Sequence, residues 1–154
     1  PIQLEPVKIK GMFDEINRVV SIEPKMTVEP DNLAVYADRD HFSRILINLI
    51  ENAAKYAPDS PVELYAWQNN QRALVAVVDH GPGIPEHSRE SIFERFTQLD
   101  QSDTRSRGGT GLGLSIVKSL VEVMNGAVRV EATEGGGATF VLDLPAAVSI
   151  PVDV

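Results

Sequence analysis

Apolar residues recur along this chain with two different spacings. In residues 9–20 and 39–56 they return every three or four positions, which predicts two amphipathic helices. The apolar stripe of the second helix should pack on a sheet, and it consists of Phe42, Ile45, Leu46, Leu49, Ile50 and Ala53. A third helix is expected from just after Gly111 to about Met124, because Asn125-Gly126 is typical of residues that end a helix.

Shorter apolar segments, several with period two, predict strands. The expected strands are residues 2–7, 33–37, 62–67, 74–78, 127–131 and 139–144, with a weaker one between Pro24 and Pro30. Two pairs of them should form hairpins, one turning at Asn69-Asn70 and the other across Gly135–Gly137. Hairpins mixed with helices favour an α+β fold: a two-layer α/β sandwich whose mixed, mainly antiparallel sheet is covered by helices on one face.

The length and charge of the chain limit what it can be. Its 154 residues suit one domain, expected over residues 1–145, followed by a short tail over residues 146–154. A formal net charge of −8 argues against nucleic acid as a partner, because that needs a basic surface. No apolar run approaches the ~20 residues that cross a bilayer, and the chain has no cysteine for thiolate chemistry. A cytoplasmic location is the expectation.

Residues 107–117 join a glycine-rich loop directly to the third predicted helix, in the order Arg-Gly-Gly-Thr-Gly-Leu-Gly-Leu-Ser-Ile-Val. Glycine lets backbone amides approach a ligand closely. The amides of a first helical turn have no partner within the helix and lie at its positive end. The segment therefore predicts a phosphate site. A glycine-rich turn that only connects two elements is the alternative for this segment taken alone.

The helix predicted over residues 39–56 also has a polar face. Asn48, Asn52 and Lys55 lie at positions i, i+4 and i+7 and share that face, with Glu51 at its edge. Mg²⁺ prefers oxygen ligands such as these amides and usually takes phosphates as further ligands. A solvated polar face is the alternative.

The strand expected over residues 74–78 is followed by Asp79-His80-Gly81-Pro82-Gly83-Ile84. A carboxylate only accepts hydrogen bonds, so a buried Asp79 would recognise a donor such as the exocyclic amine of adenine. The two glycines would allow the backbone to lie against a purine. The alternative is a tight turn capped by the aspartate.

Residues 91–107 combine an apolar anchor, Phe93 and Phe96, with an almost wholly polar second part. This composition is typical of a mobile lid. Arg105 and Arg107 carry guanidinium groups that suit phosphate oxygens. A disordered charged loop is the alternative.

Taken in order, these motifs resemble the N, G1, F and G2 boxes of the catalytic ATP-binding domain of sensor histidine kinases, a group shared with gyrase, Hsp90 and MutL. The matching segments are Asn48-x-x-x-Asn52-x-x-Lys55-Tyr56, Asp79-x-Gly81-x-Gly83-Ile84, Phe93-x-x-Phe96, Gly109-Thr110-Gly111-Leu112-Gly113-Leu114 and Gly137-Ala138-Thr139-Phe140. The resemblance covers residues 2–144. It implies a Bergerat-type fold in which ATP lies between the helices and a flexible lid.

The resemblance also implies the residues that bind the nucleotide and its metal. Asn52 would be the Mg²⁺ ligand, with Asn48 near the metal and the phosphates. Lys55 and Tyr56 would lie on the phosphate and ribose side. Asp79 would bind the adenine amine directly, and Thr139 would help through a water. Further contacts with the nucleotide would come from Gly81, Gly83, Ile84 and Phe96.

The phosphates would be held by backbone amides at the start of the third helix and by the lid. The amides belong to Gly109, Thr110, Gly111, Leu112, Gly113 and Leu114, and Arg105 would reach the phosphates from the lid. The residues expected to take part in catalysis are Asn48, Asn52, Lys55 and Arg105.

Position 48 separates two kinds of enzyme within this group. The hydrolytic relatives have a glutamate there, which acts as general base for water. Asn48 is neutral and cannot accept the proton, so hydrolysis is expected to be slow.

The expected activity is transfer of the γ-phosphoryl group of Mg-ATP to a histidine. In the resembling family that histidine lies in an upstream helical hairpin, and His41, His80 and His87 lack its sequence context. We therefore expect the kinase module of a larger sensor, monomeric when isolated, whose partners are its own dimerisation hairpin and a downstream response regulator. The alternatives are a serine kinase of the anti-sigma-factor type and a nucleotide-gated interaction module without enzymatic activity.

Overall fold

The computed structural model describes residues 1–20, 24–94 and 113–147. The helices are α1 (Ile9–Asn17), α2 (Arg39–Tyr56) and α4 (Gly113–Val123), with short 3₁₀ helices η1 (Glu86–Ser88) and η2 (Ser91–Phe93). The strands are β1 (Glu5–Lys8), β2 (Lys25–Glu29), β3 (Ala34–Ala37), β4 (Glu63–Asn69), β5 (Arg72–Val78), β6 (Ala127–Ala132) and β7 (Ala138–Pro145).

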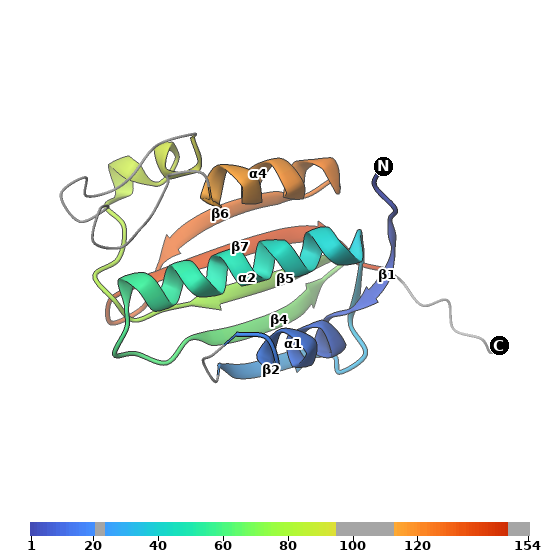
Figure 1. The fold of residues 1–154 in the computed structure, drawn as a ribbon, viewed down its shortest axis with the longest axis horizontal. Helices are drawn as coiled ribbons and strands as arrows, with labels where there is room; N and C mark the ends of the chain where they lie inside the picture. Colours follow the sequence, from blue (N-terminus) through green and yellow to red (C-terminus); the bar gives the residue numbers. More distant parts are fainter. Residues whose placement is uncertain (21–23, 95–112, 148–154) are drawn as a thin grey trace.

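Five strands form the main sheet in the order β2-β4-β5-β7-β6. β2 runs parallel to β4, and every other neighbouring pair is antiparallel. The helices α1, α2 and α4 lie on one face of this sheet, with α2 across its middle (Figure 1). This arrangement confirms the predicted two-layer sandwich with a mixed, mainly antiparallel sheet.

The core lies between the helices and the inner face of the sheet. Side chains alternate along each strand, so Ala73, Val75 and Val77 of β5 point toward the helices. All six residues of the apolar stripe predicted for α2 are buried against this layer. The central strand β5 is also covered on its outer face, where Leu74, Ala76 and Val78 pack with Val141 and Tyr65.

The first strand differs from its expected position. β1 begins at Glu5 instead of Ile2, and it pairs with β3 in a separate two-stranded sheet. Asp38 joins this small sheet to α2, because its Oδ2 accepts a hydrogen bond from the Gln3 amide at 2.9 Å. Its Oδ1 caps α2 by accepting from the amides of Asp40 and His41, both at 3.1 Å. These hydrogen bonds, that of Gln3 first, hold the pKa of Asp38 below its usual value.

The predicted hairpins form with small changes of boundary. β4 extends to Asn69 and β5 begins at Arg72, so the turn contains Asn70, whose φ is +57°, and the next residue. The helix α4 ends as predicted: Asn125 adopts a φ of +65°, and the Gly126 amide donates to the Val121 carbonyl at 3.0 Å.

The end of the described chain is attached to the domain. β7 runs to Pro145, and the amides of Ala146 and Ala147 then donate to the carbonyls of Gln71 and Ala34. Residues 148–154 lie outside the described part of the chain. The division between domain and tail at residue 145 stays a prediction.

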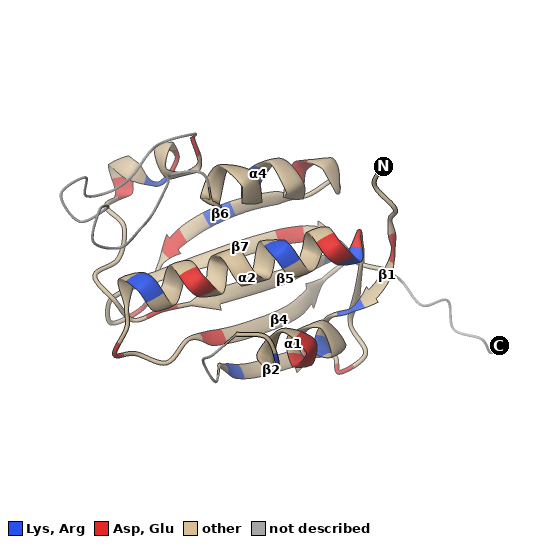
Figure 2. Ribbon diagram, in the orientation of Figure 1, with Lys and Arg blue, Asp and Glu red and all other residues tan. Residues whose placement is uncertain are grey.

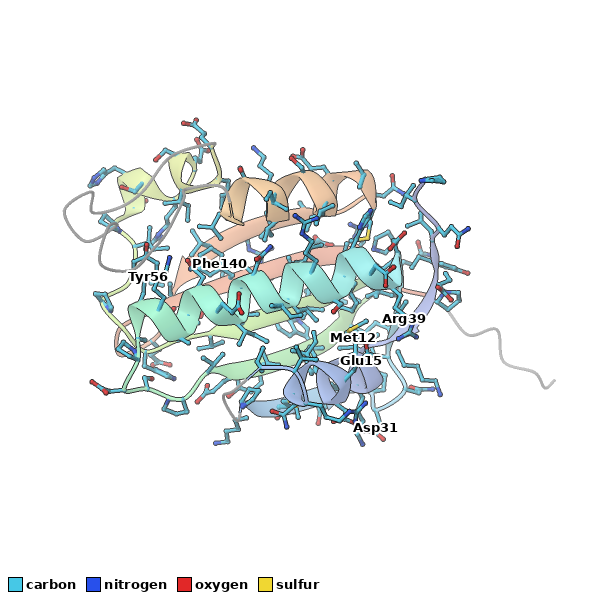
Figure 3. The ribbon with its side chains drawn as sticks, viewed as in Figure 1. Met12, Glu15, Asp31, Arg39, Tyr56 and Phe140 are labelled. Atoms are coloured by element: carbon cyan, nitrogen blue, oxygen red, sulfur yellow. The ribbon has the colours of Figure 1, made fainter. Side chains whose placement is uncertain are left out.

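The helical layer carries charges of both signs. Basic and acidic residues are interspersed along α2 (Figure 2). Arg39, in its first turn, pairs with Glu15 of α1 through Nη1 and Oε1 at 3.5 Å, while Tyr56 marks its other end (Figure 3). Within the described ranges no helix has the length and apolar character needed to cross a bilayer.

Candidate functional site

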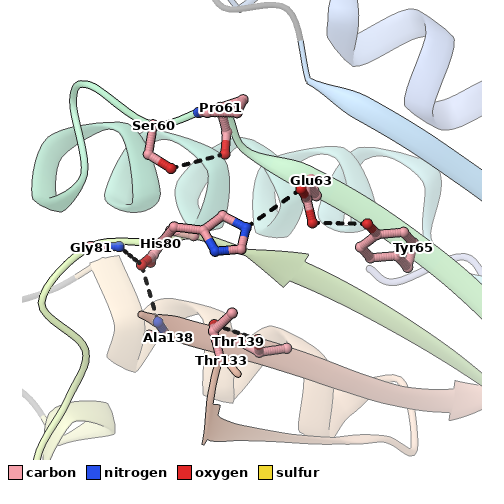
Figure 4. A network of polar contacts seen from close by, with 10 residues as sticks. Ser60, Pro61, Glu63, Tyr65, His80, Gly81, Thr133, Ala138 and Thr139 are labelled. Atoms are coloured by element: carbon pink, nitrogen blue, oxygen red, sulfur yellow. Dashed lines mark hydrogen bonds and ion pairs between the residues drawn. The ribbon is translucent and has the colours of Figure 1, made fainter. Parts of the chain in front are cut away.

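Asp79 is the buried polar residue at the end of the central strand. It follows Val78 directly, and strand alternation points its side chain toward the helical layer, where it is 4% exposed. Its Oδ1 accepts hydrogen bonds from the amides of Gly81 at 3.0 Å and Ala138 at 3.1 Å (Figure 4). Both side-chain hydrogen bonds that Asp79 makes with described residues end on Oδ1.

Three segments meet around this carboxylate with their backbones in contact. A Cβ on Gly81 would lie 2.9 Å from both the Tyr56 carbonyl and the Ala57 Cβ, so the turn after β5 packs on the end of α2. Gly137, with φ +118°, lies against the carbonyl of Asp79, and a Cβ there would come within 2.7 Å of the His80 Cα. Residues without a side chain are therefore required for these segments to close around Asp79.

The last strand contributes a backbone amide to the surroundings of Asp79 rather than a hydroxyl. Ala138 donates to Asp79, whereas strand alternation places the next residue, Thr139, on the outer face of the sheet. There its Oγ1 lies 2.9 Å from the Oγ1 of Thr133 (Figure 4). The structure does not bring the Thr139 hydroxyl together with the Asp79 carboxylate, and the water-mediated role of Thr139 stays a prediction.

The polar residues of α2 lead away from Asp79 along the helix. Tyr56 abuts the turn, and its half-buried neighbours Asn52 and Asn48 lie one and two turns earlier, about 6 and 12 Å along the axis. Lys55 places its Nζ 5.8 Å from the centroid of the Tyr56 ring. The helix thus brings Asn52, Lys55 and Tyr56 to the same end of the sandwich as Asp79, whereas Asn48 lies nearer the middle of the helix.

Residues 37–148 match the family described as histidine kinase-, DNA gyrase B- and HSP90-like ATPase. The chain belongs to this family.

Relatives of the chain within the family are histidine kinases. The sensor histidine kinase TmoS of Ectopseudomonas mendocina is 42% identical over 139 residues, which cover 89% of this chain and 14% of TmoS. The chain therefore spans about a seventh of the length of this curated relative.

Solved structures of histidine kinases share the fold. Full-length ShkA in complex with AMPPNP superposes with a TM-score of 0.82 at 32% identity, covering 97% of this chain and 32% of that one. The histidine kinase ThkA in complex with the response regulator TrrA has a TM-score of 0.74 at 25% identity, covering 92% of this chain and 41% of that one.

Several predicted residues of this ATPase domain lie outside the described part of the chain. They are Phe96, Arg105, Gly109, Thr110, Gly111 and Leu112. The predicted anchor residue Phe93 is buried, and its ring stacks edge-on against Phe140 at a centroid distance of 6.0 Å. Gly113 begins α4, whose first turn lies at the end of the molecule where α2 ends (Figure 1). Leu114 and Ile84 are partly buried against the core.

The side chains near Asn52 suit a cation that takes most of its ligands from molecules other than the protein. Within the described ranges no three His, Asp or Glu side chains gather to hold a metal ion. A cation at the Asn52 amide would therefore take most of its oxygens from water and from the phosphates of a nucleotide. Mg²⁺ is usually bound in that way.

A network of polar side chains on the outer face of the sheet was not predicted from the sequence. His80 Nε2 lies 3.4 Å from Glu63 Oε2, and the Tyr65 hydroxyl donates to Glu63 Oε1 at 2.8 Å (Figure 4). The hydrogen bond from Tyr65 is the main cause that lowers the pKa of Glu63, and the same bond raises the pKa of Tyr65. This polar network follows only from the register of β4 against β5, because Glu63 and His80 are far apart in sequence.

Replacing Gly137 tests the close approach of the last hairpin to Asp79. We expect Gly137→Ala to lower the free energy of unfolding by at least about 2 kcal/mol, through its positive φ together with the collision with residues 79–80. Gly135→Ala is the matched control: φ is +87° there, but a Cβ would meet nothing within 4 Å. It should cost only the ~1–2 kcal/mol of the left-handed conformation. Equal losses in urea unfolding would contradict the close approach.

Proposed function

We propose that this chain binds Mg-ATP and transfers its γ-phosphoryl group to a histidine on a separate dimerisation hairpin, within a two-component system whose response regulator then receives the group. The observation that carries the proposal is the buried Asp79 carboxylate at the end of β5, beside the helix that bears Asn48 and Asn52. The kinase TmoS, the AMPPNP complex of ShkA and the response-regulator complex of ThkA support the enzyme class, the nucleotide and the kind of partner.

Asp79 would select the base. Its Oδ1 is occupied by two backbone amides, and Oδ2 would accept a hydrogen bond from the exocyclic amine of adenine. Guanine has a carbonyl at that position, which would face the carboxylate as a second acceptor. The backbone of Gly81 and Gly83 would lie against the purine, with Ile84 at its side.

The residues of α2 would bind the phosphate end. Asn52 would hold Mg²⁺ through its amide oxygen, Asn48 would lie near the metal and phosphates, and Lys55 would approach the phosphates with Tyr56 on the ribose side. When bound, Mg²⁺ supplies neutralisation of charge on the phosphate oxygens. Phe96 and Arg105 of the expected lid and the amides from Gly109 to Leu114 would also contact the nucleotide.

Transfer of the γ-phosphoryl group to a protein would be faster than hydrolysis of ATP, because an attacking water would have no general base. A nitrogen of the acceptor imidazole would form a bond to the γ-phosphorus as the bond to the departing ADP oxygen breaks. That imidazole needs positioning more than activation, since phosphoryl transfer depends mainly on alignment and charge. Asn48 occupies the position from which a glutamate would activate water, and its amide is a poor proton acceptor. Bound ATP should therefore persist until the acceptor domain is aligned.

Transfer to a hairpin tests the function directly. The full chain, Mg²⁺ and γ-labelled ATP are mixed with a separately produced phosphoacceptor hairpin, and we expect label on the hairpin that is acid-labile and base-stable, as phosphohistidine is. The chain without the hairpin is the control and should release little phosphate. Acid-stable label would indicate a serine kinase, and hydrolysis by the chain alone near the ~10 s⁻¹ of a median enzyme would indicate an ATPase.

Replacing Asp79 tests the adenine assignment. We expect Asp79→Asn to weaken ATP binding at least tenfold, because a charged hydrogen bond worth ~1.5–3 kcal/mol is lost and an amide donor would face the adenine amine. Calorimetric titration measures the affinity. The asparagine oxygen can still accept from Gly81 and Ala138, so the thermal unfolding curve should change little and serves as the control for folding. Unchanged affinity would remove the assignment.

Replacing Asn52 tests the metal assignment. We expect Asn52→Ala to abolish most of the gain in ATP affinity that Mg²⁺ provides, while metal-free ADP binds nearly as before. The comparison requires titrations with and without Mg²⁺. Arg44→Ala, on an exposed position of the same helix, is the matched control and should keep the full gain. If Asn52→Ala also kept the full gain in ATP affinity from Mg²⁺, the metal would be bound elsewhere.

A further inference from the structure

The turn that presents Asp79 is held from both faces of the sheet. Strand alternation sends Asp79 toward the helices and His80 toward the outer face. On that face His80 is 40% exposed and lies 3.4 Å from the carboxylate of Glu63, which is 19% exposed. The inner contacts of the turn are made by backbone amides to Asp79 Oδ1, whereas the outer contact joins two side chains (Figure 4).

The partner of His80 belongs to an interior strand of the sheet. Glu63 begins β4 and lies in register with Val78, the last residue of β5. β4 is an interior strand, paired with β2 on one side and with β5 on the other. Tyr65 fixes the other carboxylate oxygen of Glu63 at 2.8 Å. Glu63 therefore cannot follow His80 easily, and the contact restrains the turn rather than the strand.

The charges around the pair favour an ionised Glu63. The pKa of Glu63 is lowered chiefly by the hydrogen bond from Tyr65, and also by His80 and by Lys25, which faces it from β2. On the β7 side the same row continues with uncharged Thr139 and then Glu131, whose carboxylate is paired with Arg129. Protonation of His80 would therefore turn a contact between a carboxylate and a neutral imidazole into an ion pair with Glu63.

We propose that Glu63 is a positioning residue for the nucleotide site: it holds His80 on the outer face of the sheet and thereby fixes the turn from which Asp79 meets the base. The inference rests on the proposed binding of adenine by Asp79. The apparent affinity of a site falls in proportion to the fraction of molecules in the competent conformation, and the Glu63–His80 contact raises that fraction. Both side chains lie on the face of the sheet opposite to the Asp79 carboxylate, so neither would contact a nucleotide bound by Asp79.

A double-mutant cycle on the full chain tests the coupling. Glu63→Gln, His80→Gln and the double variant are titrated with Mg-ATP by calorimetry at pH 6. We expect each single substitution to weaken binding about threefold to tenfold, and the double variant to bind no more weakly than the singles. Additive losses, or none, would overturn the inference.

The pH dependence of ATP affinity distinguishes a positioning role of Glu63 from a merely structural one. ATP titrates in the same range as histidine, so the quantity to compare is the ratio of wild-type to His80→Gln affinity, in which the ligand's own titration cancels. Because protonation gives His80 a charge opposite to that of Glu63, this ratio should be larger at pH 5.5 than at pH 8. It should be close to one at both pH values when Glu63 is replaced by glutamine. A ratio that does not change with pH in wild-type background contradicts the proposal.

A second carboxylate on the same face is the control for stability. Asp143 of β7 pairs with Arg72 at the opposite end of β5, with Oδ1 and Nε 2.6 Å apart. Asp143→Asn should lower the free energy of unfolding while leaving the affinity for Mg-ATP unchanged. Equal loss of affinity in Asp143→Asn and Glu63→Gln would assign both effects to stability and overturn the inference. ATP binding that needs Asp79 but ignores Glu63 overturns this inference alone, whereas a wild-type chain that binds no ATP overturns the proposed function with it.

Discussion

A carboxylate that is almost fully removed from water must be matched by hydrogen-bond donors, and Asp79 imposes this requirement on the whole domain. Its donors are backbone amides from its own turn and from the start of β7. They reach it only because β5 and β7 pair in one register and because glycines allow the turns to touch. The same contacts bring the end of α2 against the turn. The hydrogen bonds of one buried carboxylate therefore go together with the meeting of these three segments.

Local patterns were sufficient to predict the helices and the layer architecture. The stripe of α2 fixes which side of that helix is buried, and from this the polar face with Asn48 and Asn52 follows directly. Contacts that depend on strand register were not predictable in the same way. Thr139 and Ala138 differ by one position, yet the pleat sends the first outward and uses the amide of the second for Asp79. The pairing of Glu63 with His80 and the separate β1–β3 sheet likewise require knowledge of which strands are neighbours.

The central strand serves two different surfaces at once. β5 is buried on both faces, so it reads in the sequence as a continuous apolar run without the alternation of a half-exposed strand. In the two residues directly after β5, alternation places different side chains on the two faces, with Asp79 on the inner face and His80 on the outer face. The transition from strand to turn is therefore the place where a small change in backbone direction would alter both faces together.

Both ends of the described chain are attached at the end of the domain opposite to Asp79. Gln3 bonds to the cap of α2, and Ala147 bonds to Ala34 nearby, whereas the turn after β5 packs on the last residues of α2 (Figure 1). The 18 residues of that helix separate the two ends by about 27 Å. A partner that held the domain at the end where Gln3 and Ala147 are attached would be separated from Asp79 by the length of α2. A rotation of the domain by about 20° about that attached end would therefore move Asp79 through about 9 Å.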